Sequence, residues 1–226
     1  MSDPVFPSRL LSSREPSTLD FVQYLFEGYS KRGLTNQTDK MAAISGIETR
    51  IARAFNCQIY YGIVGQFFCK TLLWQREAER LKKIDYGNKR VPSWSWMSYD
   101  GAIKFMIEPS DTIDSAIALG FYQNRRGCLN VEVADFWEFS LKEHDTEYEV
   151  LDLQGQKVGT IYYDTDDIIQ SPQCVIVGRS PRSDEMYRYF ILVVKPTLVQ
   201  SEYERIGCGN IGSSHISRIS GRVRLV

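Results

Sequence analysis

The sequence Val91-Pro92-Ser93-Trp94-Ser95-Trp96 lies where the character of the chain changes. Before this segment, apolar residues recur at the spacing of helices. After it, short β-branched and aromatic runs alternate with turn residues, as in consecutive antiparallel strands. Successive side chains of an extended segment point to opposite sides, so both indoles are expected on one side and both hydroxyls on the other. We therefore expect helices and a sheet to meet at this segment and to share one interior.

Three segments before residue 87 have the apolar pattern of helices. The first begins at a predicted capping box, Ser17–Asp20, in which a hydroxyl and a carboxylate three residues apart can accept bonds from free amides. The second is expected to begin between Thr35 and Thr38. The third is the almost wholly apolar run from Tyr60 to Trp74, continued by charged residues 75–83. The apolar positions of the first two helices are Val22, Leu25, Phe26 and Tyr29, then Met41, Ile44, Ile47, Ile51 and Phe55.

The rest of the chain is expected to form consecutive antiparallel strands. Leu129, Val131 and Val133 occupy every second position of one run, which predicts a strand with one buried side. Turn residues 152–156 predict a hairpin between two strands. The predicted strands are Ala102–Ile107, Ala116–Tyr122, Cys128–Phe136, Tyr148–Leu153, Lys157–Asp164, Gln173–Gly178, Tyr187–Lys195, Glu202–Gly207 and Arg222–Val226.

These patterns predict an α+β fold, in which an N-terminal helical subdomain of about three helices packs on a C-terminal antiparallel β-barrel or sandwich. We assign residues 1–16 to an N-terminal arm, residues 17–86 to the helical subdomain and residues 87–226 to the antiparallel β subdomain. The two subdomains are expected to form one continuous fold, because a chain of 226 residues that is 43% hydrophobic can bury a large core.

Composition argues against several partners and compartments. The 27 basic and 28 acidic residues give a net charge of −1, whereas binding to phosphate backbones requires a basic surplus, so we expect no nucleic acid partner. No run approaches the ~20 apolar residues of a transmembrane helix, so we expect no membrane partner. The five cysteines are widely spaced, and Met1–Leu10 lacks the pattern of a secretory signal. These features predict reduced thiols in a cytoplasmic protein.

Four blocks of the sequence resemble, in the same order, the region that follows the N-terminal domain of fungal heterokaryon-incompatibility (HET) proteins. They are Gly28–Gly46, with GYSKRGLT and DKMAAISG; Tyr61–Trp74, with YG and LLW; Val91–Trp96; and Leu192–Gly207, with LVVKP and EYERIG. The run Pro-Ser-Trp-Ser-Trp is the most distinctive of them. The resemblance implies a module without the N-terminal HET domain, so the cell-death activity associated with that domain is not carried over.

Aromatic residues near the junction are the main candidates for a ligand site. One interpretation places Trp94 and Trp96 in the core. The other makes them walls of an apolar pocket in which an unsaturated ligand stacks, with Tyr99 or Asp100 as polar or catalytic groups. The predicted ligand-binding residues are Trp94, Ser95, Trp96, Tyr122, Phe136 and Trp137.

The sequence contains no recognisable motif for metal or nucleotide chemistry. Gly207–Gly212 spells G-x-G-x-x-G, but a dinucleotide site needs a βαβ unit of ~30 residues, and only fourteen residues follow. The acidic turn Asp164–Asp167 lacks the glycine and the closing glutamate of a calcium loop and is expected in solvent. His144 and His215 have no partners at a zinc-like spacing. We therefore expect no metal and no other cofactor.

Two functions from different classes are open at this point. The first is a noncatalytic module that binds a protein partner or an apolar small molecule in a fungal regulatory or incompatibility role. The second is a cofactor-independent cyclase or pericyclase of fungal secondary metabolism, which holds one substrate conformer in the aromatic pocket. Such catalysis needs orientation and a few hydrogen bonds, so the lack of motifs does not exclude it. No set of residues requires catalysis, which favours the first function.

Overall fold

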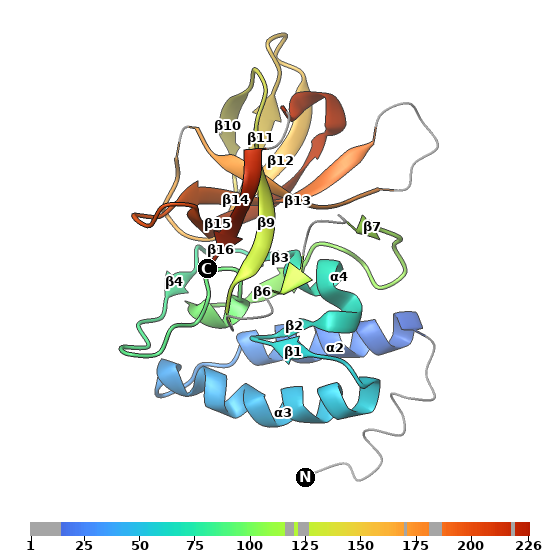
Figure 1. The fold of residues 1–226 in the computed structure, drawn as a ribbon, viewed down its shortest axis with the longest axis vertical. Helices are drawn as coiled ribbons and strands as arrows, with labels where there is room; N and C mark the ends of the chain where they lie inside the picture. Colours follow the sequence, from blue (N-terminus) through green and yellow to red (C-terminus); the bar gives the residue numbers. More distant parts are fainter. Residues whose placement is uncertain (1–14, 116–119, 122–126, 170, 181–186, 218–219) are drawn as a thin grey trace.

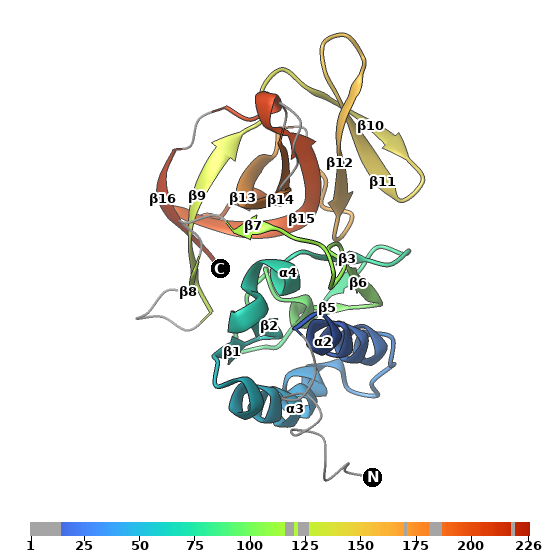
Figure 2. The same cartoon turned by 90° about the vertical axis from the view of Figure 1, so that its right-hand side faces the viewer.

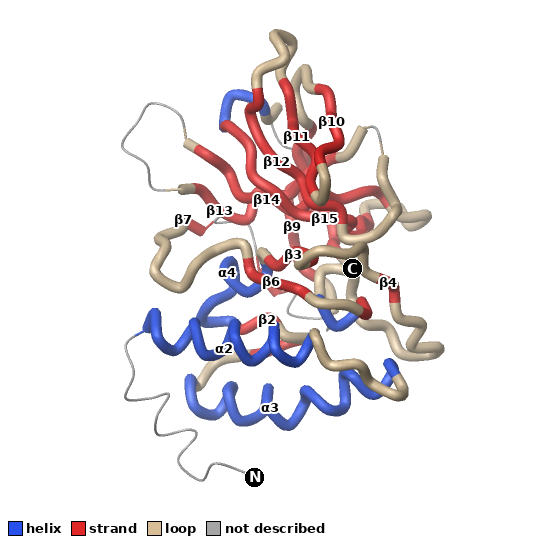
Figure 3. The backbone as a smooth tube through the Cα atoms, turned by 180° about the vertical axis from the view of Figure 1, so that it is seen from behind, coloured by secondary structure: helices blue, strands red, loops and turns tan. Residues whose placement is uncertain are grey.

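The structure is a computed structural model that describes residues 15–115, 120–121, 127–169, 171–180, 187–217 and 220–226. Two sixteen-residue helices, α2 (Glu15–Ser30) and α3 (Lys40–Phe55), form one end of the molecule (Figure 1). The long strands form the other end, and the short helix α4 (Phe68–Leu72) lies between them (Figure 3). The predicted α+β class, with helices packed against a C-terminal sheet, is therefore confirmed.

Helix α2 already includes Glu15 and Pro16, before the predicted capping box, so the predicted helix start is wrong. Thr18 and Leu19 are buried within the helix instead of capping it. The apolar spacing itself is confirmed, since Val22 and Phe26 are fully buried.

Helix α3 follows a 3-10 turn (Gln37–Asp39) at the predicted position. Ile44 and Ile51 of the predicted stripe are fully buried, and Ile47 and Phe55 pack beside them. The helix ends at Asn56, which adopts a left-handed conformation with φ of 47°. Asparagine tolerates that conformation better than most residues, so the residue type at position 56 favours the end of the helix there.

The predicted third helix over Tyr60–Trp74 is wrong except at α4. Strands β1 (Ile59–Tyr60) and β2 (Ile63–Val64) form a tight hairpin, followed by a 3-10 turn (Gly65–Phe67), α4 and β3 (Trp74–Arg76). Tyr61 and Gly62 have φ of 52° and 79°, the left-handed pair that a two-residue hairpin requires. A Cβ at Gly62 would lie 2.2 Å from the indole nitrogen of Trp96, so a glycine also permits this close packing.

The strands of the described residues form one large sheet and three two-stranded sheets. The small sheets are β1–β2, β3 with β6 (Ile103–Phe105), and β4 (Lys82–Lys83) with β5 (Tyr99–Asp100). The large sheet contains β7 (Asp114–Ser115), β8 (Gly120–Phe121), β9 (Leu129–Asp135), β10 (Ser140–His144), β11 (Glu147–Leu151), β12 (Lys157–Tyr163), β13 (Gln173–Arg179), β14 (Arg188–Pro196), β15 (Glu202–Gly212) and β16 (Ser220–Leu225).

The large sheet curls on itself. Its main order is β10-β11-β12-β15-β14-β13-β9-β16, with antiparallel neighbours. Strand β16 also makes a short parallel contact with β15, through Glu202 opposite Arg224 and Tyr203 opposite Leu225. Strands β15, β14, β13, β9 and β16 therefore surround one interior, while the β10–β11 hairpin extends away from it (Figure 2).

Most predicted strands are confirmed, with small shifts of their ends. The predictions for β9, β11, β12, β13, β14 and β16 agree to within one or two residues. Strand β15 continues to Gly212, and β6 is shorter than its predicted range. Strand β10 was not predicted. The prediction over 116–122 falls outside the described residues except at β8.

Buried apolar residues form three clusters. The junction core joins α4 and Trp94 to the curled sheet, the helical core lies between α2, α3 and Trp96, and the hairpin core fills the space beneath β10–β12. Because the junction core combines residues from both halves, the helices and the sheet share one interior, as the sequence predicts. Its buried members are Ile63, Cys69, Leu72, Leu73, Trp94, Ile107, Leu129, Val131, Val133, Val175, Val177, Leu192, Val194, Cys208 and Leu225.

Candidate functional site

The segment with the two predicted indoles turns at Ser95 and does not continue as an extended chain. The Oγ of Ser95 accepts a hydrogen bond from the Met97 amide at 3.0 Å and donates one to the Tyr61 carbonyl at 2.7 Å. This turn separates the indoles, which were predicted on one side of an extended segment. Trp94 packs in the junction core and Trp96 in the helical core.

Both indoles are fully buried among other rings. The ring of Trp94 meets Tyr61 edge to face, with centroids 5.9 Å apart, and the ring of Trp96 lies 5.4 Å from Phe26. Side chains with no exposed surface do not line a cavity that a water-sized molecule can enter. The prediction that both rings pack in the core is confirmed, but only Trp94 lies where the helical half meets the large sheet.

Lys40, the first residue of α3, is buried beneath Trp96. Its Nζ lies 4.8 Å from the centroid of the Trp96 ring and donates a hydrogen bond of 2.5 Å to the carbonyl of Tyr99. Burial lowers the pKa of this ammonium from 10.5 to about 8, and the charge of Asp100 partly opposes the shift. The ammonium is fixed by carbonyls and a ring face, which suits a structural role better than contact with a ligand.

A buried ion pair between Arg205 and Asp164 lies at the junction. The guanidinium reaches the two carboxylate oxygens at 2.9 and 3.0 Å, and both side chains are almost fully buried. It also donates to the carbonyls of Leu72 and Trp74 and lies 3.4 Å from the centroid of the Trp74 ring. Asp164 is thus a core residue, and its predicted place in a solvated turn is wrong.

Three of the four blocks that carry the HET resemblance contact one another at this junction. Ser93 accepts a hydrogen bond from the amide of Arg205 at 2.8 Å and donates one to the carbonyl of Val226. The indole of Trp74 donates to the carbonyl of Trp94 at 2.9 Å. Residues at these positions therefore hold the helical half against the sheet, which gives the motif segments a structural role.

The other predicted site residues are distributed over the molecule. The hydroxyl of Tyr99 lies 3.4 Å from the carbonyl of Arg205, and burial strongly raises its pKa. Asp100 accepts a hydrogen bond from Gln37, Phe136 belongs to the hairpin core, and Trp137 is 56% exposed. Tyr122 lies outside the described residues. Trp94, Trp96, Phe136 and Trp137 thus do not surround one common cavity.

One cleft of about 400 Å³ opens beside the motif segment, and we call it the Ser93 cleft. Ile84 and Pro92 are buried in its wall, and Val91 is half-buried. Lysine and arginine side chains from the loop after β4 stand at its rim. The lining residues are Lys83, Ile84, Asp85, Tyr86, Gly87, Lys89, Arg90, Val91, Pro92, Ser93, Ser98, Gly127, Cys128, Glu204 and Val226.

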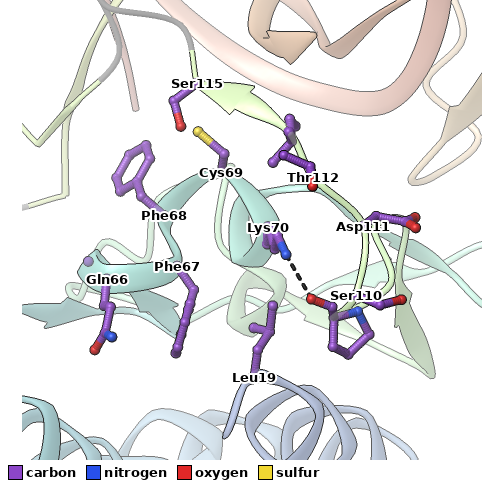
Figure 4. Close-up of a pocket in the computed structure, with 13 residues that line it drawn as sticks. Leu19, Gln66, Phe67, Phe68, Cys69, Lys70, Ser110, Asp111, Thr112 and Ser115 are labelled. Carbon is purple, nitrogen blue, oxygen red and sulfur yellow. Dashed lines mark hydrogen bonds between the residues drawn. The ribbon is translucent and has the colours of Figure 1, made fainter. Parts of the chain in front are cut away.

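A second pocket of about 420 Å³, here called the Lys70 pocket, lies between α2, α4 and the loop before β7 (Figure 4). Leu19 and Phe67 lie in its apolar wall, and Lys70 stands at its centre. The volumes of both cavities fall in the usual range for ligand sites, roughly 300–1,000 Å³. No sequence pattern indicated this pocket, because its walls come from segments that are distant along the chain.

No family model, no curated protein and no solved structure matches this chain. The HET resemblance therefore stays a prediction from the sequence. Within the described ranges, no helix has the length and apolar character to cross a membrane, and no group of three or more histidine, cysteine or acidic residues could hold a metal ion. All five cysteines are thiols, four of them buried.

Proposed function

We propose that this protein is a noncatalytic binding module whose Ser93 cleft accepts an acidic segment of a partner protein. The observation that carries the proposal is that Lys89 and Arg90, at the rim of the cleft, have no carboxylate partner among the described residues. Both side chains are exposed. Exposed cations that no internal charge neutralises attract an acidic surface and orient it during encounter.

Lys83, the third cation of the cleft, differs from Lys89 and Arg90 because it has a carboxylate partner. The ammonium of Lys83 lies 3.1 Å from a carboxylate oxygen of Glu204, whose second oxygen lies 3.2 Å from Lys195. The carboxylate of Asp85 accepts a hydrogen bond from the Gly87 amide. The side chains that line the cleft include the cations Lys83, Lys89 and Arg90 and the acids Asp85 and Glu204, so cations are in excess among them.

Apolar surface beside the cations indicates the kind of segment that fits. Ile84 and Pro92 offer an apolar wall for one side chain of the partner between acidic residues. A mixed apolar and charged surface of this kind is common in protein interfaces.

The HET resemblance supports a regulatory or incompatibility role in a fungus for such a module. A cofactor-free cyclase, the other function that the sequence left open, would need an accessible aromatic pocket. Trp94 and Trp96, two of its predicted walls, are fully buried in separate cores. No observation on the described residues favours that second function.

The test is binding of a fluorescent peptide in which aspartate and glutamate flank one leucine, followed by fluorescence anisotropy. The double variant Lys89→Glu, Arg90→Glu should weaken binding roughly fivefold to thirtyfold, because two exposed charge contacts contribute about 0.5–1 kcal/mol each. Added salt should weaken binding of the wild-type protein, since ions screen exposed charges beyond ~10 Å at 0.1 M.

The matched control is the double variant Arg50→Glu, Lys142→Glu, which makes the same change of net charge on exposed side chains of α3 and β10. It should bind the peptide as the wild-type protein does. A peptide with glutamine and asparagine in place of the acids should bind poorly. Equal binding of the acidic peptide by both double variants would refute the proposal.

A further inference from the structure

We propose that the Lys70 pocket binds a small carboxylic acid with an apolar chain. This inference does not rest on the proposed function, because the Lys70 pocket and the Ser93 cleft share no lining residue. The apolar wall would take the chain of the acid, and the ammonium of Lys70 would take its carboxylate. The contacts and charges of the pocket support each part of this assignment.

The wall of the pocket combines apolar side chains from three segments. Leu19 rises from α2 below Lys70, and Phe67 lies to its left in Figure 4. Ile113, from the loop before β7, is packed against the junction core. Leu19 and Phe67 belong to the helical core and are almost fully buried, so their positions are fixed by packing. The exposed apolar surface of the pocket comes from the half-buried Ile113 and Phe68. A ligand that covers it removes that surface from water, which is favourable in proportion to the area.

The polar group at the centre is an ammonium with spare donors. Nζ of Lys70 donates one hydrogen bond, to the carbonyl of Pro109 at 2.9 Å, although an ammonium has three protons. No carboxylate of the described residues lies within ion-pair distance of it. Asp111, the acidic residue of the lining, points away from Lys70 in Figure 4. The cation therefore has room for one external anion.

The single lysine of the lining favours a carboxylate over other charged groups of a ligand. Phosphate groups carry more charge and are usually held by several cations or by arginine forks, whereas this lining offers one lysine. An amine would be repelled by the ammonium. The lining also contains the hydroxyls of Ser110, Thr112 and Ser115, which can hydrogen-bond a carboxylate oxygen.

The test compares octanoate, octan-1-ol and octylamine by isothermal titration calorimetry on the full chain. Octanoate should bind roughly tenfold to hundredfold tighter than octanol, because a hydrogen bond to a charged partner is stronger than a neutral one. Octylamine should bind more weakly than octanol. In Lys70→Met the preference for octanoate should vanish, while octanol binds as before.

Controls locate the effect and separate it from damage to the fold. Thr112→Trp should fill the pocket and abolish octanoate binding, whereas Lys104→Met, which removes an exposed charge from β6, should leave it unchanged. If Lys70→Met loses both ligands, Lys70→Arg decides: a retained preference for octanoate supports the proposal, and its loss refutes it. Equal binding of octanoate and octanol by the wild-type protein, or wild-type octanoate binding by Thr112→Trp, would overturn it.

Discussion

At the scale of single residues, Lys40 shows how burial sets the chemistry of a side chain. The residue is 4% exposed, and its ammonium contacts the Tyr99 carbonyl and the Trp96 ring. These contacts replace only part of its hydration, so the folded protein disfavours the charged form. The pKa of Lys40 accordingly falls from 10.5 to about 8 in the folded state.

This shift predicts how the stability depends on pH. Between about pH 8 and the unfolded pKa of 10.5, the unfolded chain binds more protons at Lys40 than the folded protein does. The free energy of unfolding should therefore rise with pH across this window, by up to about 3 kcal/mol at ~1.4 kcal/mol per pKa unit. Below this window the cost of the buried charge is fully present.

Urea unfolding of the wild-type protein and of Lys40→Met at about pH 8 and about pH 10 checks this prediction. The stability of the wild-type protein relative to the variant should increase with pH. The exposed control Lys104→Met should show a constant difference from the wild-type protein. A difference between wild type and Lys40→Met that stays constant as well would show that Lys40 keeps an ordinary pKa.

Residue roles were predictable where local chemistry decided them. The burial of Trp94 and Trp96 could be predicted because two large apolar rings lie where the helical pattern of the sequence gives way to the pattern of strands. Asp164 could not be placed from its neighbours, since Asp166 and Asp167 beside it are exposed. Its partner Arg205 is distant along the chain, and only the sheet pairing of β12 with β15 brings them together.

At the scale of elements, glycines fix the approach of β12 to β15. A Cβ at Gly209 would lie 2.2 Å from the carbonyl oxygen of Thr160, and one at Gly207 would lie 2.4 Å from that of Tyr162. The run G-x-G-x-x-G, which has too few residues after it to be a nucleotide motif, thus lies in β15, where two backbones pack closely. Its first two glycines serve this strand contact.

Two glycine substitutions should consequently act in opposite directions. Gly209→Ala should lower the free energy of unfolding by about 1–3 kcal/mol, because the methyl group forces the strands apart. Gly46→Ala in α3 meets nothing within 4 Å and should raise it by about 0.5–1 kcal/mol through helix propensity. Denaturation in urea measures both. Equal effects of the two substitutions would contradict this account of the strand contact.

Elements with a strong period were predictable, and elements defined by tertiary contacts were not. Helix α3 and strand β9 follow from their apolar spacing. The apolar run over 60–74 has no period that distinguishes a helix from short buried strands. The turn at Tyr61 and Gly62 makes its first part a hairpin, and the sequence pattern did not predict that turn. Strand β10 is mostly exposed and polar, so it carries little signal of its own and forms through its pairing with β11.

At the scale of the whole molecule, one buried network joins the helical half to the sheet. Arg205 of β15 binds Asp164 after β12 and also the carbonyls of Leu72 and Trp74 at the end of α4 and the start of β3. The junction core surrounds this network with apolar side chains from both halves. The two halves are therefore expected to lose their structure together, as one cooperative unit.

Asp164→Asn tests this coupling, because it leaves the buried Arg205 charge without its carboxylate. Removing one partner of such a pair costs about 3–5 kcal/mol. Hydrogen exchange should show that the free energy of opening falls equally for amides of α3 and of β14, although only β14 belongs to the sheet. The control Glu143→Gln weakens an exposed contact of 3.3 Å with Arg80 and should cost less than about 1 kcal/mol. Protection that falls in β14 but stays unchanged in α3 would mean that the helical half holds itself together without the sheet, and that the residues of the junction do not couple them.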